Sequence, residues 1–477
     1  MRLSKTEFIH YLNCPKSFWL LLKAPNEYPH KEFSVFLQKL TREGYEVERY
    51  VRQFFEHAQE RSADFQRVFE TEDGLFARAD AIEAINGGTV LYEIKSSTSV
   101  KVDAAHNHLK DACFQVICAE RTGQKIDAVS LVHLNGNYVR DGEIVPEEML
   151  VFEDVTERVR AIEAETKAEI GEALALLREV ELDRSGCSCI HKSRSNHCDA
   201  FALFNPAIPK PSIYSIPRLS AKKRAELIAS GILDLLAIPD DYTLSANQAG
   251  LVQATKSGAP IVNPDGIRAF LAQLSFPLYF LDYETFASAA PVLDRTSPHK
   301  HFPVQYSLHV LNADGSLNHH EYLERELRLP DRLVGRLGAD IGDEGSVISW
   351  HASFEKTQNK EMARLFPDFS DFLAGLNDRM ADLEDVFKTD YVDARFDGST
   401  SIKKVLPVVC PELSYKGLDV QDGASAMDAW QKMVTTQGEE SNKIATALLG
   451  YCKLDTFAMV EIYRFLVRLT ASTSFQS

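Results

Sequence analysis

The chain has 477 residues, of which 45% are hydrophobic and 25% charged, and its formal net charge is −17. This length predicts about two to four domains, and the acidic balance argues against a uniformly basic nucleic-acid binder. No apolar run reaches membrane-spanning length, and residues 18–22 are too short for a secretory signal, so we expect a cytoplasmic protein without a membrane partner. Its eight cysteines do not make a disulfide scaffold, and clustered cysteines in a reducing compartment more often bind metal.

The opening residues predict two short helices separated by a Cys-Pro turn. Ser4 and Glu7 have the spacing of a capping box, and the second helix is expected to begin near Lys16. Cys14 lies at the junction of the two helices. Apolar residues at helical spacing then continue to about residue 54, which predicts a longer helix.

An acidic hairpin follows this helical region. Residues 74–82 and 89–95 predict two strands joined by an Asn-Gly-Gly turn. Asp80 lies late in the first strand, and two-residue spacing places Glu93 and Lys95 on one face of the second. A metal held by the two acids would polarise a phosphate, while the lysine could orient water or stabilise developing charge. The alternative is a surface hairpin with an ordinary Glu–Lys pair.

A helix predicted over residues 104–123 carries Gln115. The acidic hairpin followed by this helix resembles the RecB-like branch of the PD-(D/E)XK nucleases, where an acid, an E-x-K and a later Q-x-x-x-Y helix make one site. The resemblance implies that Glu48 and Gln115 complete the site. Two positions depart from the pattern, because Ala119 stands in place of the tyrosine and Glu48, four residues after Gly44, in place of the usual histidine.

A helical segment over residues 156–178 leads to a cysteine cluster. Together with the N-terminal cysteine it supplies four thiolates, enough for one zinc ion or one iron–sulfur cluster: Cys14, Cys187, Cys189 and Cys198. This arrangement resembles the iron–sulfur staple of the CRISPR-associated RecB-like exonucleases, which implies a structural four-iron, four-sulfur (4Fe-4S) cluster. Zinc and unliganded cysteines are the alternatives, and His191 and His197 are alternative ligands. The other cysteines lie in apolar contexts and are predicted to be core residues: Cys113, Cys118, Cys410 and Cys452.

The middle of the chain predicts a linker and a helical connector. Residues 204–217 are dense in proline, and residues 219–248 are helical with a turn at Gly231. The segment 226–235 resembles half of a helix-hairpin-helix, whose glycine turn can offer backbone amides to a phosphate. A plain helical connector is the alternative.

An apolar, aromatic strand over residues 277–286 is broken by two acids. Asp282 and Glu284 fall on one face of this strand, while Tyr283 points the other way. Magnesium and other hard cations favour oxygen ligands, and two-metal phosphodiester chemistry needs several of them. The pattern predicts a metal site at the edge of a core, with a strand that merely ends in polar residues as the alternative.

The remaining C-terminal elements complete a second acidic pattern. Three further strands are expected at residues 304–311, 319–323 and 346–350. A helix then begins near Glu355, and a late apolar helix places Tyr451 and Asp455 on one face.

The order D-x-E, F-E, Y-x-x-x-D resembles the DEDD exonucleases of the RNase H-like superfamily, tyrosine subtype. The resemblance implies that Tyr451 orients water and that single strands are degraded from 3′ to 5′. It also implies that four acids hold two magnesium or manganese ions: Asp282, Glu284, Glu355 and Asp455. Glu355 stands where aspartate is usual.

Nearly the whole chain resembles a little-characterised bacterial family that fuses these two nucleases, through residues 397–407, 114–115 and 133–135. We predict an α/β protein with a restriction-endonuclease-like domain, a connector, an RNase H-like domain and a disordered tail: residues 1–203, 204–274, 275–470 and 471–477. The predicted function is a dual nuclease acting on single-stranded DNA. The alternatives are an RNA-processing exonuclease, because no ribose-reading motif separates the two polymers, and a nucleic-acid-end-binding scaffold with a decayed N-terminal site.

Overall fold

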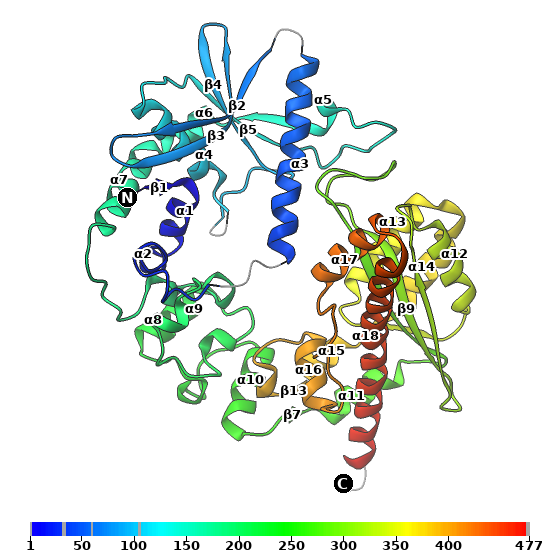
Figure 1. Cartoon of the computed structure of the whole chain (residues 1–477). Helices are drawn as coiled ribbons and strands as arrows, with labels where there is room; N and C mark the ends of the chain where they lie inside the picture. Colours follow the sequence, from blue (N-terminus) through cyan, green and yellow to red (C-terminus); the bar gives the residue numbers. More distant parts are fainter. Residues whose placement is uncertain (1, 31–34, 59–60, 104–105, 474–477) are drawn as a thin grey trace. The chain divides into compact units, whose positions relative to one another are not determined.

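The computed structural model has a mixed α/β architecture of helices and mixed β-sheets (Figure 1). The residues it describes are 2–30, 35–58, 61–103 and 106–473. The chain divides into two compact units, unit 1 with residues 1–208 and 288–300, and unit 2 with residues 209–287 and 301–477. The predicted connector therefore falls within unit 2 from residue 209 onward, while its first five residues belong to unit 1. Residues 288–300, which follow the predicted strand 277–286, also belong to unit 1. No helix among the described residues is both long and apolar enough to cross a membrane.

Unit 1 is built on one mixed sheet. Its strands are β1 (Leu3–Ser4), β2 (Ala63–Glu70), β3 (Leu75–Ile85), β4 (Gly88–Ile94), β5 (Ala128–Leu134) and β6 (Leu150–Asp154). The order is β1-β3-β4-β5-β6, with β2 also paired to β3. The predicted hairpin is confirmed, because β3 and β4 pair antiparallel across a turn in which Asn86 and Gly87 both have positive φ, 54° and 78°. The adjacent pair β4–β5 is parallel.

Unit 1 also contains helices, some of which pack on this sheet. They are α1 (Lys5–Asn13), α2 (Pro15–Lys23), α3 (Val35–His57), α4 (His108–Arg121), α5 (Pro146–Met149), α6 (Thr156–Ala161), α7 (Glu163–Leu176) and α8 (Phe201–Phe204). The predicted capping box is confirmed, since the Ser4 hydroxyl accepts from Glu7 N at 3.3 Å and Glu7 Oε2 accepts from Ser4 N at 2.6 Å. The helix predicted over residues 156–178 is two helices, α6 and α7, which meet at Ile162.

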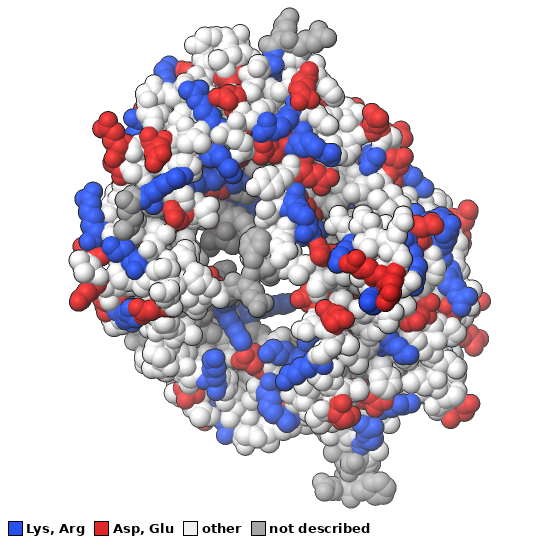
Figure 2. Space-filling view, viewed as in Figure 1, with Lys and Arg blue, Asp and Glu red and all other residues white. Residues whose placement is uncertain are grey.

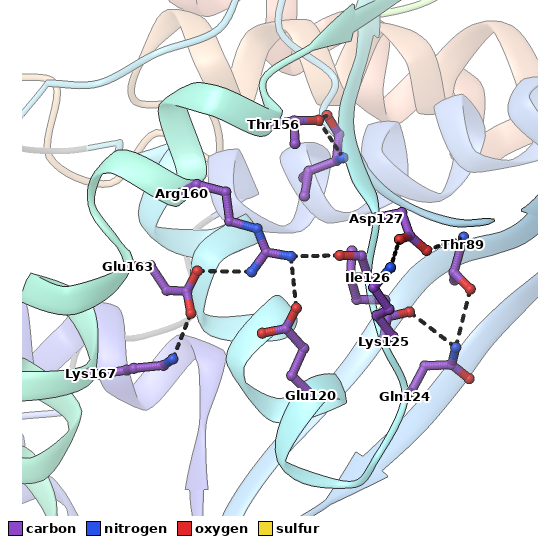
Figure 3. Close-up of polar contacts among 11 residues, drawn as sticks. Thr89, Glu120, Gln124, Lys125, Ile126, Asp127, Thr156, Arg160, Glu163 and Lys167 are labelled. Atoms are coloured by element: carbon purple, nitrogen blue, oxygen red, sulfur yellow. Dashed lines mark hydrogen bonds and ion pairs between the residues drawn. The ribbon is translucent and has the colours of Figure 1, made fainter.

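Arg160 joins three elements of unit 1 (Figure 3). Its guanidinium donates to Glu163 of α7 at 2.8 Å, to Glu120 of α4 at 2.7 Å and to the carbonyl of Ile126 at 2.5 Å. Ile126 lies two residues before β5, so this fork holds α6 and α4 against the start of that strand. β5 in turn pairs with β4, the strand that carries Glu93 and ends directly before Lys95.

Unit 2 is built on a five-stranded mixed sheet. Its strands are β8 (Leu278–Phe286), β9 (Phe302–Leu311), β10 (Leu317–Leu323), β11 (Ser346–Ser349) and β12 (Met380–Asp382), in the order β10-β9-β8-β11-β12. The central strand β8 is antiparallel to β9 and parallel to β11. The four strands predicted from the sequence are present, and β12 is an additional edge strand.

Unit 2 also contains helices, some of which cover the two faces of this sheet. They are α9 (Ala221–Ala229), α10 (Ala246–Ser257), α11 (Pro264–Ala272), α12 (Asp331–Asp340), α13 (Ser353–Leu365), α14 (Ser370–Asp378), α15 (Glu384–Thr389), α16 (Ile402–Val409), α17 (Gly423–Thr435) and α18 (Gly438–Thr473). A small sheet pairs β7 (Ile261–Val262) with β13 (Tyr391–Val392). Helix α18 runs three residues into the predicted tail, whose last four residues lie outside the described part of the chain.

The alternation of β8 separates two cores. Leu278 and Phe280 pack with residues of α11, α16 and α18, while Tyr279, Leu281 and Tyr283 pack with residues of α12, α13 and α14. The Tyr283 hydroxyl donates to Asn359 Oδ1 at 2.9 Å on the second side. The acids on either side of Tyr283 therefore face α18, as the two-residue spacing predicted.

Candidate active and metal sites

The structure brings the predicted acids of unit 2 into one buried cluster. Asp282 and Glu284 come from β8, Glu355 from the first turn of α13, and Asp455 from α18. One ligand atom each of Asp282, Glu284 and Cys452 lies within 4.8 Å of the others. Glu355 and Asp455 are only 3% and 8% exposed.

The acids of this cluster oppose one another's ionisation. Burial, followed by the charge of Asp455, raises the pKa of Asp282 well above its usual value. Burial and the charge of Asp282 also raise the pKa values of Glu284 and Glu355. Burial raises the pKa of Asp455 to about 6. Glu355 Oε2 is also among the buried side-chain oxygens of the described residues that have no hydrogen-bond partner. Carboxylates that repel one another and leave an oxygen unpartnered fit a site for hard divalent cations.

Cys452 belongs to this cluster as well as to the core. It is fully buried, as the sequence predicted, and its thiol donates to Asp282 Oδ2 at 3.5 Å. Sequence reasoning assigned it only to the core. The available signal was its position inside the Tyr451–Asp455 turn of α18.

Two residues that the sequence did not single out lie beside Tyr451 and Asp455. Lys403 Nζ donates to the Tyr451 hydroxyl at 3.0 Å, and the Tyr415 hydroxyl donates to Asp455 Oδ1 at 2.6 Å. Burial is the largest factor that raises the pKa of both tyrosines. Lys403 lies in the stretch 397–407 that supported the resemblance, whereas no spacing rule indicated Tyr415.

The predicted residues of unit 1 also come together. Glu48 of α3, Asp80 of β3, Glu93 of β4 and Lys95, which directly follows β4, line one pocket of about 230 Å³. Lys95 Nζ lies 2.8 Å from Glu93 Oε1, and Asp80 Oδ2 accepts a hydrogen bond from the amide of Ile94 at 2.8 Å. The hairpin therefore places both acids and the lysine in one site.

Gln115 and Ala119 lie behind this pocket on α4. Gln115 Nε2 donates to Glu93 Oε2, so the glutamine supports the acid from the buried side. Ala119, at the position of the tyrosine in the Q-x-x-x-Y pattern, is fully buried in the core and contributes no polar group.

The unit 1 site contains a second lysine that the sequence analysis missed. Lys5, the first residue of α1, donates to Glu93 Oε1 at 2.7 Å. Burial opposes the ionisation of Glu93, but the charges of Lys5 and Lys95 outweigh it and keep the pKa of Glu93 below its usual value. Burial and the charge of Glu93 raise the pKa of Asp80 to about 7. Lys5 and Glu93 are 88 residues apart in the sequence, so no local pattern indicated the contact.

Other side chains engage the outer members of the unit 1 site. Lys95 also pairs with Asp111 of α4. Glu48 accepts from Arg52 at 2.6 Å and from Gln66 at 2.8 Å. The acids of this site are thus largely paired with cations and donors of the protein itself.

The four predicted cysteines form a third site. Cys14 ends α1 and precedes α2, and the other three lie in the segment between α7 and α8. The sulfurs of Cys14, Cys187, Cys189 and Cys198 lie within 4.8 Å of one another, and all four residues are buried, so the group could bind a metal.

The candidate histidine ligands do not join this group. Among the described residues, the cluster comprises the four cysteines, and the His197 ring instead stacks on Phe201 with centroids 3.5 Å apart. Asn205 Nδ2 donates to Cys187 Sγ at 3.4 Å, the kind of outer contact that orients a thiolate ligand.

Comparisons with known proteins match parts of the chain. The family model for a domain of unknown function (DUF2779) matches residues 279–401, which include Asp282, Glu284 and Glu355 but end before Lys403 and α18. An uncharacterized protein of Mycoplasma pneumoniae, described as the MG366 homolog, is 28% identical over 210 residues, or 39% of this chain. The chain spans about a third (32%) of the length of that relative.

Proposed function

We propose that this chain is a metal-dependent nuclease with one active site in each unit. Unit 2 would be an RNase H-like DEDD exonuclease, and unit 1 a RecB-like PD-(D/E)XK nuclease. The observation that carries the proposal is the buried carboxylate cluster of unit 2, with Tyr451 one helical turn from Asp455. Buried acids that raise one another's pKa values destabilise a fold, so such a cluster is favoured where a function requires it. The central position of β8, which carries Asp282 and Glu284, also supports the proposal.

In unit 2 the protein would supply ligands and orientation. Magnesium or manganese, when bound by the four acids, would stabilise the charge that develops during phosphodiester hydrolysis. The Tyr451 hydroxyl would orient the attacking water, because it lies on the face of α18 that carries Asp455. By resemblance, the substrate is single-stranded DNA degraded from 3′ to 5′, with RNA as the alternative.

In unit 1 the two acids of the hairpin would hold the metal. Asp80 fits this role because its Oδ2 accepts from the Ile94 amide, an outer contact that orients the carboxylate toward the pocket it shares with Glu93. Lys95 would stabilise the phosphate, and Glu48 and Gln115 would complete the site.

For the cysteine group, we propose one tetrahedral zinc ion with a structural role. Four thiolates about 2.3 Å from a single ion stand roughly 3.8 Å apart in a tetrahedron. A 4Fe-4S cluster places each thiolate beyond its own iron, which spreads the sulfurs farther apart. A separation within 4.8 Å for every pair therefore favours the single ion over the cluster. The site would fix α1 and α2 to the end of unit 1, and four ligands leave no position open for chemistry.

A second candidate function is a nucleic-acid-end-binding scaffold in which the unit 1 site no longer cleaves. The pairing of Glu93 with Lys5 and Lys95 favours this candidate, because the protein itself neutralises the acid that a metal would need. Basic and acidic side chains are interspersed on the face drawn in Figure 2, so binding would rest on local groups of lysines and arginines.

The proposal is tested with end-labelled single-stranded DNA and RNA in the presence of Mn²⁺. The wild-type protein is compared with Asp282→Asn, Lys95→Ala and the double variant. If each single change removes a different set of products, both sites are active. If Lys95→Ala leaves all products unchanged while Asp282→Asn abolishes them, unit 1 is a binding platform. If Asp282→Asn has no effect on any product, the assignment of unit 2 is wrong.

A further inference from the structure

Lys403 lies where the acids of unit 2 meet Tyr451. It is the second residue of α16, and its Nζ donates to the Tyr451 hydroxyl at 3.0 Å and to the carbonyl of Gln421 at 2.5 Å. Its positive charge favours ionisation of Asp282, and it acts in the same way on Glu284 and Asp455. One ammonium group therefore contacts the tyrosine and acts electrostatically on three of the four acids.

Two aromatic rings enclose this ammonium group. Lys403 Nζ lies 5.1 Å from the centroid of the Tyr451 ring and 5.6 Å from that of Tyr415. The two rings are 6.3 Å apart, and the Tyr415 hydroxyl donates to Asp455 Oδ1 at 2.6 Å. Cation–π contacts of this kind hold the ammonium in a fixed position.

We propose that Lys403 is a positioning residue for Tyr451 and that Tyr415 is a positioning residue for Asp455, so that residues 402–415 complete the active site of unit 2. This inference rests on the proposed nuclease function. It assigns roles to residues beyond the four acids and the tyrosine of the resemblance.

The direction of the hydrogen bonds gives Lys403 its role. A lysine ammonium has three donors and no acceptor, so the Tyr451 oxygen must accept from Lys403. The hydroxyl hydrogen of Tyr451 must then point away from Lys403, toward an acceptor on the side of the acids. Tyr451 is therefore a hydrogen-bond donor on that side. A water molecule oriented by Tyr451 would consequently receive a hydrogen bond through the hydroxyl hydrogen.

Tyr415 acts on the acid in the same turn of α18. Its hydroxyl donates to Asp455 Oδ1, and Tyr451 also acts on the same carboxylate, so two tyrosines surround this acid. An outer-sphere donor of this type fixes the orientation of a carboxylate ligand. Loss of the Tyr415 hydroxyl would release Asp455 to rotate without removing the ligand.

The charge of Lys403 produces a signature that a purely structural residue would not. A cation beside an acid cluster repels an incoming divalent ion, so its removal should strengthen metal binding. The same change removes the hydrogen bond that directs Tyr451, so turnover should fall. Tighter metal binding together with slower turnover is therefore the expected combination.

The experiment compares Lys403→Met, Lys403→Arg and Tyr415→Phe in the full-length protein. Lys404→Met is the matched control, because Lys404 is the next residue of α16 and its side chain is exposed. Mn²⁺ binding is measured by calorimetry, with Asp282→Asn as the reference that reports the unit 2 site. The kcat and KM values are measured on an end-labelled single-stranded oligonucleotide with Lys95→Ala in the background, so that only unit 2 acts.

We expect Lys403→Met to lower kcat about 100-fold, with KM changed by less than about 3-fold. It should bind Mn²⁺ about 3- to 10-fold more tightly. Lys403→Arg should recover part of kcat, Tyr415→Phe should lower kcat about 10-fold, and Lys404→Met should match the parent protein.

Three results would overturn the inference. An unchanged kcat in Lys403→Met excludes a positioning role. A rise in KM alone would make Lys403 a phosphate-binding residue instead, and weaker or unchanged Mn²⁺ binding would contradict the repulsion assigned to its charge. If the parent protein shows no activity, that result counts against the proposed nuclease function. The Mn²⁺ measurement then still tests Lys403, because equal affinities of Lys403→Met and the parent protein would contradict the role proposed for its charge.

Discussion

Replacement of Glu355 by glutamine should stabilise the metal-free protein and remove much of its response to metal. Glu355 lies in the first turn of α13, is 3% exposed, and its Oε2 atom has no hydrogen-bond partner. Burial and the charge of Asp282 raise its pKa well above the usual value of 4.5. At pH values between about 4.5 and its folded pKa, Glu355 therefore retains a proton in the folded protein that the unfolded chain has already released.

The size of the effect follows from this burial. Glutamine keeps the size and polarity of the side chain but cannot ionise, so it removes the cost of holding an acid protonated in the fold. That cost is on the order of 1–3 kcal/mol near neutral pH. For a unit of this size each kcal/mol shifts the unfolding midpoint by about 2–4 °C, so Glu355→Gln should unfold roughly 5 °C higher than the wild type without metal. Mn²⁺ at 100 times its Kd would stabilise the wild type by about 2.7 kcal/mol, and the variant by much less.

The pH dependence provides the second readout. Because the pKa of Glu355 is higher in the folded state, its contribution to stability is lost as pH rises from about 4.5 through the folded pKa. The unfolding midpoint of the metal-free wild type should consequently fall across this range, and Glu355→Gln should reduce that fall.

Thermal unfolding in EDTA and in Mn²⁺, between pH 5 and 8, measures both effects. Glu361→Gln is the control on the same helix, because Glu361 pairs with Arg364 at 3.2 Å near the surface and should change stability by less than about 1 kcal/mol. The reasoning is refuted if Glu355→Gln unfolds below the wild type in EDTA, or if it keeps the full stabilisation by Mn²⁺.

Two further predictions concern unit 1. Cys14→Ser should remove the metal from the cysteine site. Elemental analysis of the purified wild type should find about one zinc per chain, and its spectrum should show no iron-dependent visible absorption. Stoichiometric iron with a broad visible band would instead establish the 4Fe-4S cluster. Lys5→Met should lower the free energy of unfolding by about 1–3 kcal/mol, since it removes one partner of the buried Glu93. The control Lys16→Met, whose partner is largely exposed, should cost at most about 1 kcal/mol, and equal losses in the two variants would contradict the role given to Lys5.

Local patterns predicted the elements that carry the sites. The Asn-Gly turn fixes the register of β3 and β4, and two-residue alternation along β8 separates Tyr283 from its acidic neighbours, so both could be read directly from the sequence. Among the strands that escaped prediction, two lack such patterns. β2 is half-exposed along its length, and β12 has only three residues.

Contacts between distant residues could not be predicted in the same way. Lys5 reaches Glu93 across 88 residues, and Lys403 reaches Tyr451 across 48. Both lysines have ordinary helical surroundings in the sequence, and only the tertiary packing places their charges beside acids. The convergence of the four cysteines was predictable because thiolates have few other reasons to cluster.

The two acidic sites differ in how far the protein neutralises them. In unit 1, Glu93 contacts two lysines, and its pKa is lowered. In unit 2, the charge of Lys403 does not offset the repulsion, and Asp282 and Glu284 keep raised pKa values. A divalent cation therefore has more to gain at the unit 2 cluster, where it relieves repulsion, than at Glu93, where it must displace ammonium groups already in place. For this reason the proposed function depends first on unit 2, and the choice between nuclease and scaffold concerns unit 1 alone.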